Sequence, residues 1–129
     1  MKRYVLHTNE KDLVAIFDNN TQQQISQWWN EIKDDGLLEG RSDYYLVKDN
    51  NRKDDRKYAI FHKDNPNTPV SQWWNYIDCY HLLKGSSQYY IATNSNSQKA
   101  IFHINNPEQP VSSWVEKITH HTIEKGTLT

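Results

Sequence analysis

The sequence contains few cysteines, glycines and prolines. Its 129 residues include one cysteine, four glycines and four prolines. The single cysteine, Cys79, excludes an internal disulfide framework. With so few glycines there is no glycine-rich phosphate loop, and the sequence has no nucleophile elbow and no CxxC pair. We therefore expect a non-catalytic protein without a cofactor or a bound metal.

Long apolar runs and an excess of charge of one sign are also missing. No run approaches the roughly 18–20 apolar residues of a membrane span, and the start of the chain, MKRYVLHTNE, lacks the apolar core of a signal peptide. The formal net charge of −1 does not supply the positive field that non-specific binding to nucleic acid or to a membrane surface needs. Together with the lone thiol, these absences favour a soluble cytoplasmic protein.

Aromatic residues and repetition are what the sequence does contain. It has five tryptophans, eight tyrosines and three phenylalanines, and a tryptophan or tyrosine buries about 150–250 Å². The segment Ile25–Trp29 recurs as Val70–Trp74 and as Val111–Val115, and a glycine closes each copy. We expect a single domain, 1–129, with a small aromatic core and three repeats spanning about 3–40, 43–85 and 88–126.

Each repeat predicts two strands followed by a helix. Apolar runs on either side of a polar turn are typical of a β-hairpin. In the second repeat Thr68-Pro69 is a typical helix start, and Val70, Trp73, Trp74 and Ile77 follow at i, i+3, i+4 and i+7. The predicted fold class is therefore α+β, a mixed six-stranded sheet with three helices on one face. The alternative is a pseudo-threefold packing of the three hairpins.

Strand alternation divides the predicted sheet into two faces. Aligning Tyr4 with Tyr45 and Tyr90 places these tyrosines on the first face, together with the repeated alanines and phenylalanines, against the tryptophan helices. The second face has an apolar centre and a polar rim, which is typical of partner-binding surfaces. The candidate binding residues on it are Tyr44, Leu46, Ile60, His62, Tyr89, Ile91, Ile101 and His103.

Two groups of residues have the composition of a chemical site. Asp18, His62 and His103 occupy the same position in the three repeats, and such a set can hold a metal. In a continuous sheet they would lie about 9–10 Å apart, and only the pseudo-threefold packing would bring them together, so we expect no metal there. Cys79 lies near His81, but its helical register places it toward solvent, where we expect no catalysis. The charged turn from Lys48 to Lys57 is expected to be a solvated loop.

The function that these observations favour is protein binding without catalysis. We expect a small inhibitor or immunity-type protein, of the kind that mobile elements and phages use, which binds another protein through the second face. A homodimer through the same face is one alternative. Binding of single-stranded nucleic acid or a small ligand, with bases stacked on Tyr44 and Tyr89, is another, and the near-neutral charge disfavours nucleic acid. A metal-dependent enzyme is the least favoured function.

Overall fold

The computed structural model of the chain describes residues 3–118. The end of the third predicted repeat, residues 119–126, lies outside this range. In chain order the strands and helices are β1 (Tyr4–Thr8), β2 (Val14–Asp18), β3 (Glu31–Lys33), α1 (Asp35–Leu38), β4 (Tyr44–Lys48), β5 (Tyr58–His62), β6 (Tyr76–Asp78), α2 (Tyr80–Lys84), β7 (Tyr89–Thr93) and β8 (Lys99–His103).

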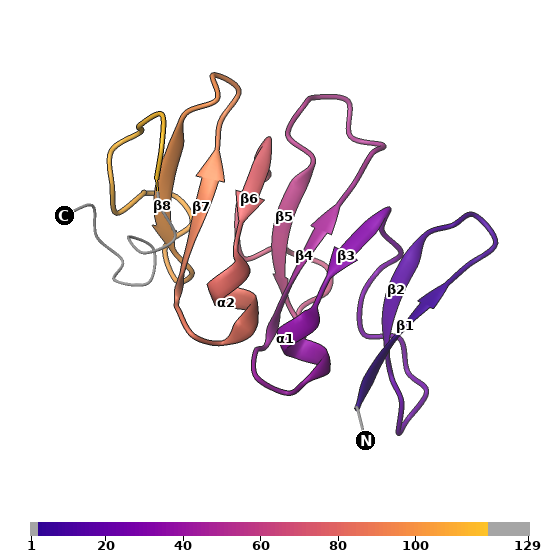
Figure 1. Cartoon of the computed structure of the whole chain (residues 1–129). Coiled ribbons are helices and arrows are strands. Elements are labelled where there is room, and N and C mark those ends of the chain that lie inside the picture. The colour runs from indigo at the N-terminus through magenta and orange to yellow at the C-terminus, as the bar shows by residue number, and fades with distance from the viewer. Residues whose placement is uncertain (1–2, 119–129) are drawn as a thin grey trace.

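Three antiparallel hairpins form the framework, at the places where the sequence predicts them. β1 pairs with β2, β4 with β5, and β7 with β8. Figure 1 shows the hairpins side by side in chain order. The short strand β3 pairs with the free edge of β4, and β6 does the same to β7, so each of these strands joins one repeat to the next.

The predicted α+β sheet with helices on one face is wrong. The described part of the chain is mostly sheet, divided into three separate sheets of two, three and three strands. Its helices are single turns of four and five residues. The alternative of three hairpins around a pseudo-threefold axis is not adopted either, because the hairpins follow one another in a row (Figure 1).

The tryptophan segments that were predicted as helices are extended. The Trp29 amide donates to the Val14 carbonyl, and the Val14 amide donates to the Trp29 carbonyl, each over 2.8 Å. The hydroxyl oxygen of Ser26 accepts a 2.8 Å hydrogen bond from the Ile16 amide. The equivalent pairs in the later repeats are Trp74 with Tyr58, Ser71 with Ile60, Val115 with Lys99, and Ser112 with Ile101. A backbone bonded to a neighbouring strand cannot make the i to i−4 bonds of a helix.

The hairpin register also corrects the alignment of the first strand. Tyr4 pairs with Asp18, which has the place of His62 in the second repeat, and His62 pairs with Tyr44. Tyr4 is therefore equivalent to Tyr44 and not to Tyr45. A shift of one residue moves every side chain of a strand to the other face, so Tyr4 belongs to the second face of its hairpin.

The core lies between successive hairpins. Leu46 and Ile60, on the second face of one hairpin, share a core with Tyr90 and Phe102, on the first face of the next. Trp74 from the linking segment fills the space between them, with its ring centroid 5.5 Å from that of Phe102. The same arrangement recurs between the first two hairpins. Each repeat thus packs on its chain neighbours, as in other repeat proteins.

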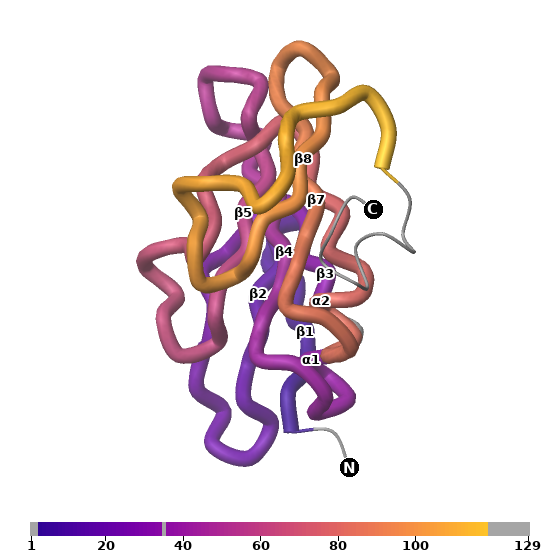
Figure 2. Tube along the Cα trace, turned by 90° about the vertical axis from the view of Figure 1, so that its left-hand side faces the viewer, coloured from indigo at the N-terminus to yellow at the C-terminus, as the bar shows by residue number. Residues whose placement is uncertain are grey.

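The two sides of this row carry different segments. Figure 2 shows α1 and α2 along one side and the loops that follow β2, β5 and β8 along the opposite side. The helices touch each other closely at Gly36, where an added Cβ would overlap the carbonyl oxygen of Leu83. This contact fixes α2 beside α1 and thereby positions the surface between the second and third sheets.

Candidate binding surface between the second and third sheets

The apolar centre of the predicted binding face is buried. Its four aliphatic side chains are at most 3% exposed: Leu46, Ile60, Ile91 and Ile101. Ile77 lies in the same core as the first two, and Ile118 packs against the other two. The expectation of an uncovered apolar face is therefore wrong, because the linking segment that follows each hairpin folds back over it. Of the four side chains, Leu46 borders a cavity.

The tyrosines and histidines of the predicted site form two equivalent pairs at strand ends. The rings of Tyr44 and His62 meet edge to face with centroids 5.1 Å apart, and those of Tyr89 and His103 do so at 4.9 Å. Each histidine Nδ1 also accepts a hydrogen bond from the backbone amide two residues further on. These contacts hold the turn after each hairpin. Because they recur in two repeats, we assign these residues a structural role.

The candidate metal ligands Asp18, His62 and His103 are not brought together. They end strands β2, β5 and β8, which belong to three different sheets. Asp18 accepts hydrogen bonds from the amides of Asn20 and Thr21 and from Arg3, and these bonds lower the pKa of its carboxyl group. Across residues 3–118 no cluster of three histidine, cysteine or acidic side chains has the arrangement of a metal site.

A cavity of about 340 Å³ opens between the second sheet, β3-β4-β5, and the third sheet, β6-β7-β8. Its base is apolar and buried, and includes Leu46, Ile77 and Leu83. Tyr76 and Tyr80 form its exposed rim, with side chains 42% and 49% exposed. A cavity with an apolar base and an aromatic rim suits an apolar group that enters from solvent.

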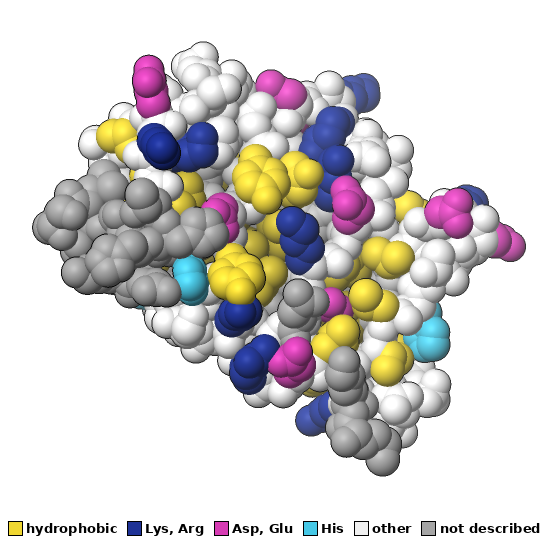
Figure 3. All heavy atoms as spheres, viewed as in Figure 1, with side chains coloured by type: hydrophobic (Ala, Val, Ile, Leu, Met, Phe, Trp, Pro, Cys, Tyr) yellow, Lys and Arg dark blue, Asp and Glu magenta, His cyan; other side chains and the backbone are white. Residues whose placement is uncertain are grey.

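Three lysines lie against three tyrosines, two of these pairs at this cavity and the third, Lys48 with Tyr58, at a smaller hollow that shares Lys33 and Leu46 with it. The ammonium of Lys84 lies 4.2 Å from the ring centroid of Tyr80, a cation–π distance. The corresponding distances are 5.8 Å for Lys33 over Tyr76 and 5.6 Å for Lys48 over Tyr58. Figure 3 shows hydrophobic side chains alternating with Lys and Arg over β6 and α2 on this face. We call these six residues and the cavity the tyrosine–lysine surface.

The lysines of the tyrosine–lysine surface differ in their ionic partners. Lys48 pairs with Glu31 at 3.5 Å, and Tyr58 together with Glu31 raises the pKa of the lysine. Among the described residues, neither Lys33 nor Lys84 lies within ion-pair distance of a carboxylate. The ammonium groups of Lys33 and Lys84 therefore flank the cavity and can each pair with an anionic group of a ligand.

Cys79 lies at the base of the cavity and is chemically protected. It is 3% exposed, so the predicted solvent-facing position is wrong. The cause is that residues 76–78 form a strand instead of a helix, which turns the next residue inward. Burial raises the pKa of the thiol, and the neighbouring Asp78 carboxyl raises it further. A neutral buried thiol is a poor nucleophile.

Comparison of the repeats shows that the tyrosines of this surface are not needed to form the fold. The three tyrosines correspond to Val14, Glu31 and Asp35 in the first repeat, so the repeated architecture does not require aromatic side chains there. Two of them, Tyr76 and Tyr80, are also exposed. The predicted helical register had assigned Tyr76 and Tyr80 no role. This difference between copies is the sequence signal that could have pointed to the surface.

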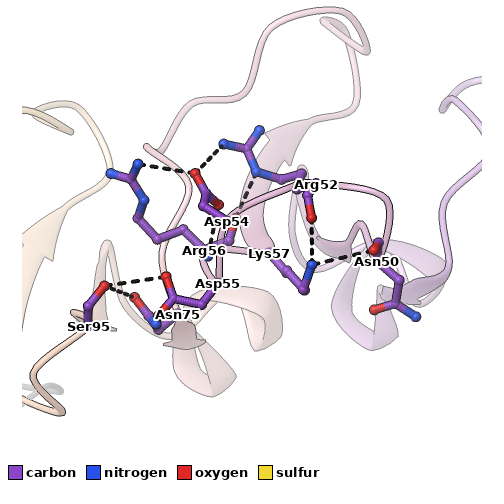
Figure 4. A network of polar contacts seen from close by, with 8 residues as sticks. All are labelled: Asn50, Arg52, Asp54, Asp55, Arg56, Lys57, Asn75 and Ser95. Atoms are coloured by element: carbon purple, nitrogen blue, oxygen red, sulfur yellow. Dashed lines mark hydrogen bonds and ion pairs between the residues drawn. The ribbon is translucent and has the colours of Figure 1, made fainter.

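The charged turn between β4 and β5 is ordered by its own charges. Arg56 and Arg52 lie 3.1 and 3.7 Å from Asp54, and Lys57 donates to the carbonyl of Arg52 over 2.7 Å. Figure 4 shows this network reaching Ser95 of the third repeat through Asp55. The turn is exposed as expected, and its two arginines are already paired with Asp54, which leaves less of the turn's positive charge for a phosphate.

Comparison with protein-family models, with curated proteins and with solved structures finds no significant match to this chain. Within residues 3–118, no helix combines the length and the apolar character that crossing a membrane requires.

Proposed function

We propose that this protein is a non-catalytic binding module that engages an extended segment of another protein through the tyrosine–lysine surface. The observation that carries the proposal is an apolar cavity flanked by two lysines, Lys33 and Lys84, that have no carboxylate partner in the described chain. A segment that places an aliphatic or aromatic side chain in the cavity and an acidic side chain beside it would satisfy both features.

The arrangement of the rings favours a protein over a nucleic acid. A stacking platform for bases needs free aromatic faces. Here Lys84 lies over the ring of Tyr80, and Tyr58 meets Tyr76 at 5.2 Å with an angle of 75° between the ring planes. A base would have to displace these neighbours to stack. The formal net charge of −1 gives no general attraction for a phosphate backbone.

A narrower form of the proposal is an inhibitor or immunity-type role in the cytoplasm. The buried thiol of Cys79 needs no oxidising compartment, which supports that location. An enzyme partner whose activity falls when this protein binds would support the inhibitor role.

A display library of random peptides tests the proposal. We expect the parent protein to enrich peptides with an acidic residue close to an apolar one, and a synthetic representative to bind in the micromolar range. Lys33→Glu combined with Lys84→Glu should weaken that binding at least tenfold. Lys53→Glu, which changes an exposed lysine of the β4–β5 turn, is the matched control and should bind like the parent.

Two results would overturn the proposal. The first is peptide binding that survives the double charge reversal in a protein shown by circular dichroism to be folded. The second is binding of mixed single-stranded oligonucleotides that weakens steeply with salt while no peptide is enriched, since that would place nucleic acid first.

A further inference from the structure

The two ends of the row of hairpins carry the two halves of a contact that is complete at each internal junction between repeats. At each internal junction a short strand of one repeat pairs with the first hairpin strand of the next, β3 with β4 and β6 with β7. Among residues 3–118, β1 pairs with β2 alone, so its outer edge has no such strand. The first repeat therefore presents, at one end, the acceptor half of a junction.

Exposure at this acceptor end shows what the missing strand would cover. By the hairpin register, Leu6 is equivalent to Leu46 and Ile91. Leu6 is 40% exposed, while its two equivalents are 2% and 3% exposed. His7 is exposed as well, whereas its equivalents Val47 and Ala92 are fully buried opposite Ile32 and Ile77.

The other end of the row presents the donor half. Ile118 is equivalent to Ile32 and Ile77 in its repeat, and it already packs on Ile91 and Ile101 as Ile77 shares a core with Leu46 and Ile60. Val111 is 49% exposed. Its equivalents Ile25 and Val70 are half-buried and pack against the core shared with the next repeat.

We propose that the donor end of one copy docks on the acceptor end of a second copy, in the geometry of the internal junctions. The segment around Lys117 and Ile118 then pairs with the outer edge of β1, with Ile118 opposite His7 and Lys117 opposite Thr8. Val111 packs over the first face of the neighbouring hairpin. The contact joins two different surfaces, so each copy keeps one free end and the assembly grows head to tail.

The occupant is a second copy because this chain supplies both halves of the junction in the same register. Side-chain differences make this junction weaker than the internal ones. Val115 replaces the tryptophan that meets the next repeat at Trp29–Trp73 and Trp74–Trp114, with centroids 5.8 and 5.3 Å apart. Polar His7 replaces the buried Val47. Association is therefore reversible and depends on concentration. The proposal is independent of the tyrosine–lysine surface.

Mixing two single variants tests the proposal, because a head-to-tail contact needs one intact end from each copy. His7→Glu places a carboxylate at a position that is exposed in the single copy and buried in the junction. Val111→Glu does the same at the donor end. Sedimentation velocity over a concentration series should show the parent forming dimers and longer species, and each variant alone remaining a monomer. An equimolar mixture of the two should form a dimer and nothing larger.

A gain-of-association variant and a control complete the test. His7→Val restores the residue type found at Val47 and should tighten association about tenfold, from the added apolar burial. Asn51→Glu, in an exposed turn of the middle repeat, should associate like the parent. The proposal is overturned if the parent and His7→Val are both monomeric at millimolar concentration. It is equally overturned if Val111→Glu still dimerises alone, which indicates a symmetric contact, or if β1 binds only strands of other proteins.

Discussion

The backbone amide of Ile60, at the centre of β5, donates a 2.8 Å hydrogen bond to the hydroxyl oxygen of Ser71. The hydroxyl in turn donates to the carbonyl of Gln72 over 2.9 Å. A side chain thus takes the place of a backbone acceptor where the linking segment runs beside the hairpin. Because Ile60 is fully buried, no solvent can replace this acceptor.

Ser71→Ala should therefore destabilise the protein by about 1–3 kcal/mol, the cost of leaving a buried amide without a partner. Ser113→Ala, at an exposed serine of the third repeat, should change the free energy of unfolding by less than about 0.5 kcal/mol. Urea unfolding followed by tryptophan fluorescence measures both. Equal unfolding midpoints for Ser71→Ala and the parent would show that this hydrogen bond does not hold the linking segment.

This serine also explains why the sequence predicted hairpins correctly and helices wrongly. The hairpin strands alternate apolar and polar residues regularly, and that period is specific to strands. In the linking segment the inward-facing Ser71 interrupts the alternation, so that Val70, Trp74 and Ile77 fall at spacings of four and three. Those are helical spacings, yet the segment is held by bonds to a neighbouring strand that no local pattern reports.

Only part of the candidate site was predicted from the sequence, for a related reason. Leu46 is a predicted binding residue and does border the cavity, but as part of its buried base. Tyr76 and Tyr80 come from the segment whose secondary structure was predicted wrongly, and a helix there does not bring them beside Leu46. Lys33 comes from the preceding repeat, and its approach depends on β3 pairing across the repeat boundary.

Gly36 and Gly40 lie four residues apart and should respond differently to alanine. A Cβ at Gly36 would overlap the carbonyl oxygen of Leu83, so Gly36→Ala must push α1 and α2 apart, at a cost of about 3 kcal/mol. Gly40 has a φ of +79° and no atom near the added Cβ, so Gly40→Ala pays only for the left-handed backbone, about 1 kcal/mol. Thermal unfolding measures both. A larger loss at Gly40 would contradict the close contact of the two helices.

The thiol of Cys79 should react slowly in the folded protein. It is buried, and burial raises its pKa above the ordinary value, so both access and thiolate fraction are low at pH 8. We expect labelling by a thiol-specific reagent to be at least a hundredfold slower in buffer than in denaturant. Labelling at the same rate in both conditions would show that the base of the cavity opens freely. Peptides that occupy the cavity should slow the reaction further.

Stability should fall in alkaline solution because of Tyr45 and Tyr90. Both side chains are fully buried, and burial raises the pKa of each phenol. In the unfolded chain a tyrosine has its ordinary pKa of about 10. From that pH upward the unfolded chain releases protons that the folded protein retains, so the free energy of unfolding decreases as pH rises. Cys79 contributes in the same direction from about pH 8.5.

The hydroxyls of Tyr45 and Tyr90 have no hydrogen-bond partner within the described chain. Removing them therefore tests the effect of phenol titration on stability while the packing of the rings is kept. Tyr45→Phe combined with Tyr90→Phe should leave the stability at pH 7 unchanged or slightly higher, because a buried unpartnered hydroxyl is lost while the stacked ring is kept. Above pH 10 the double variant should lose stability less steeply than the parent. Tyr80→Phe, at an exposed phenol, is the control and should keep the parent's alkaline slope. Urea unfolding at pH 7, 9, 10 and 11 measures the slopes, and parallel curves for parent and double variant would show that both phenols titrate normally in the folded protein.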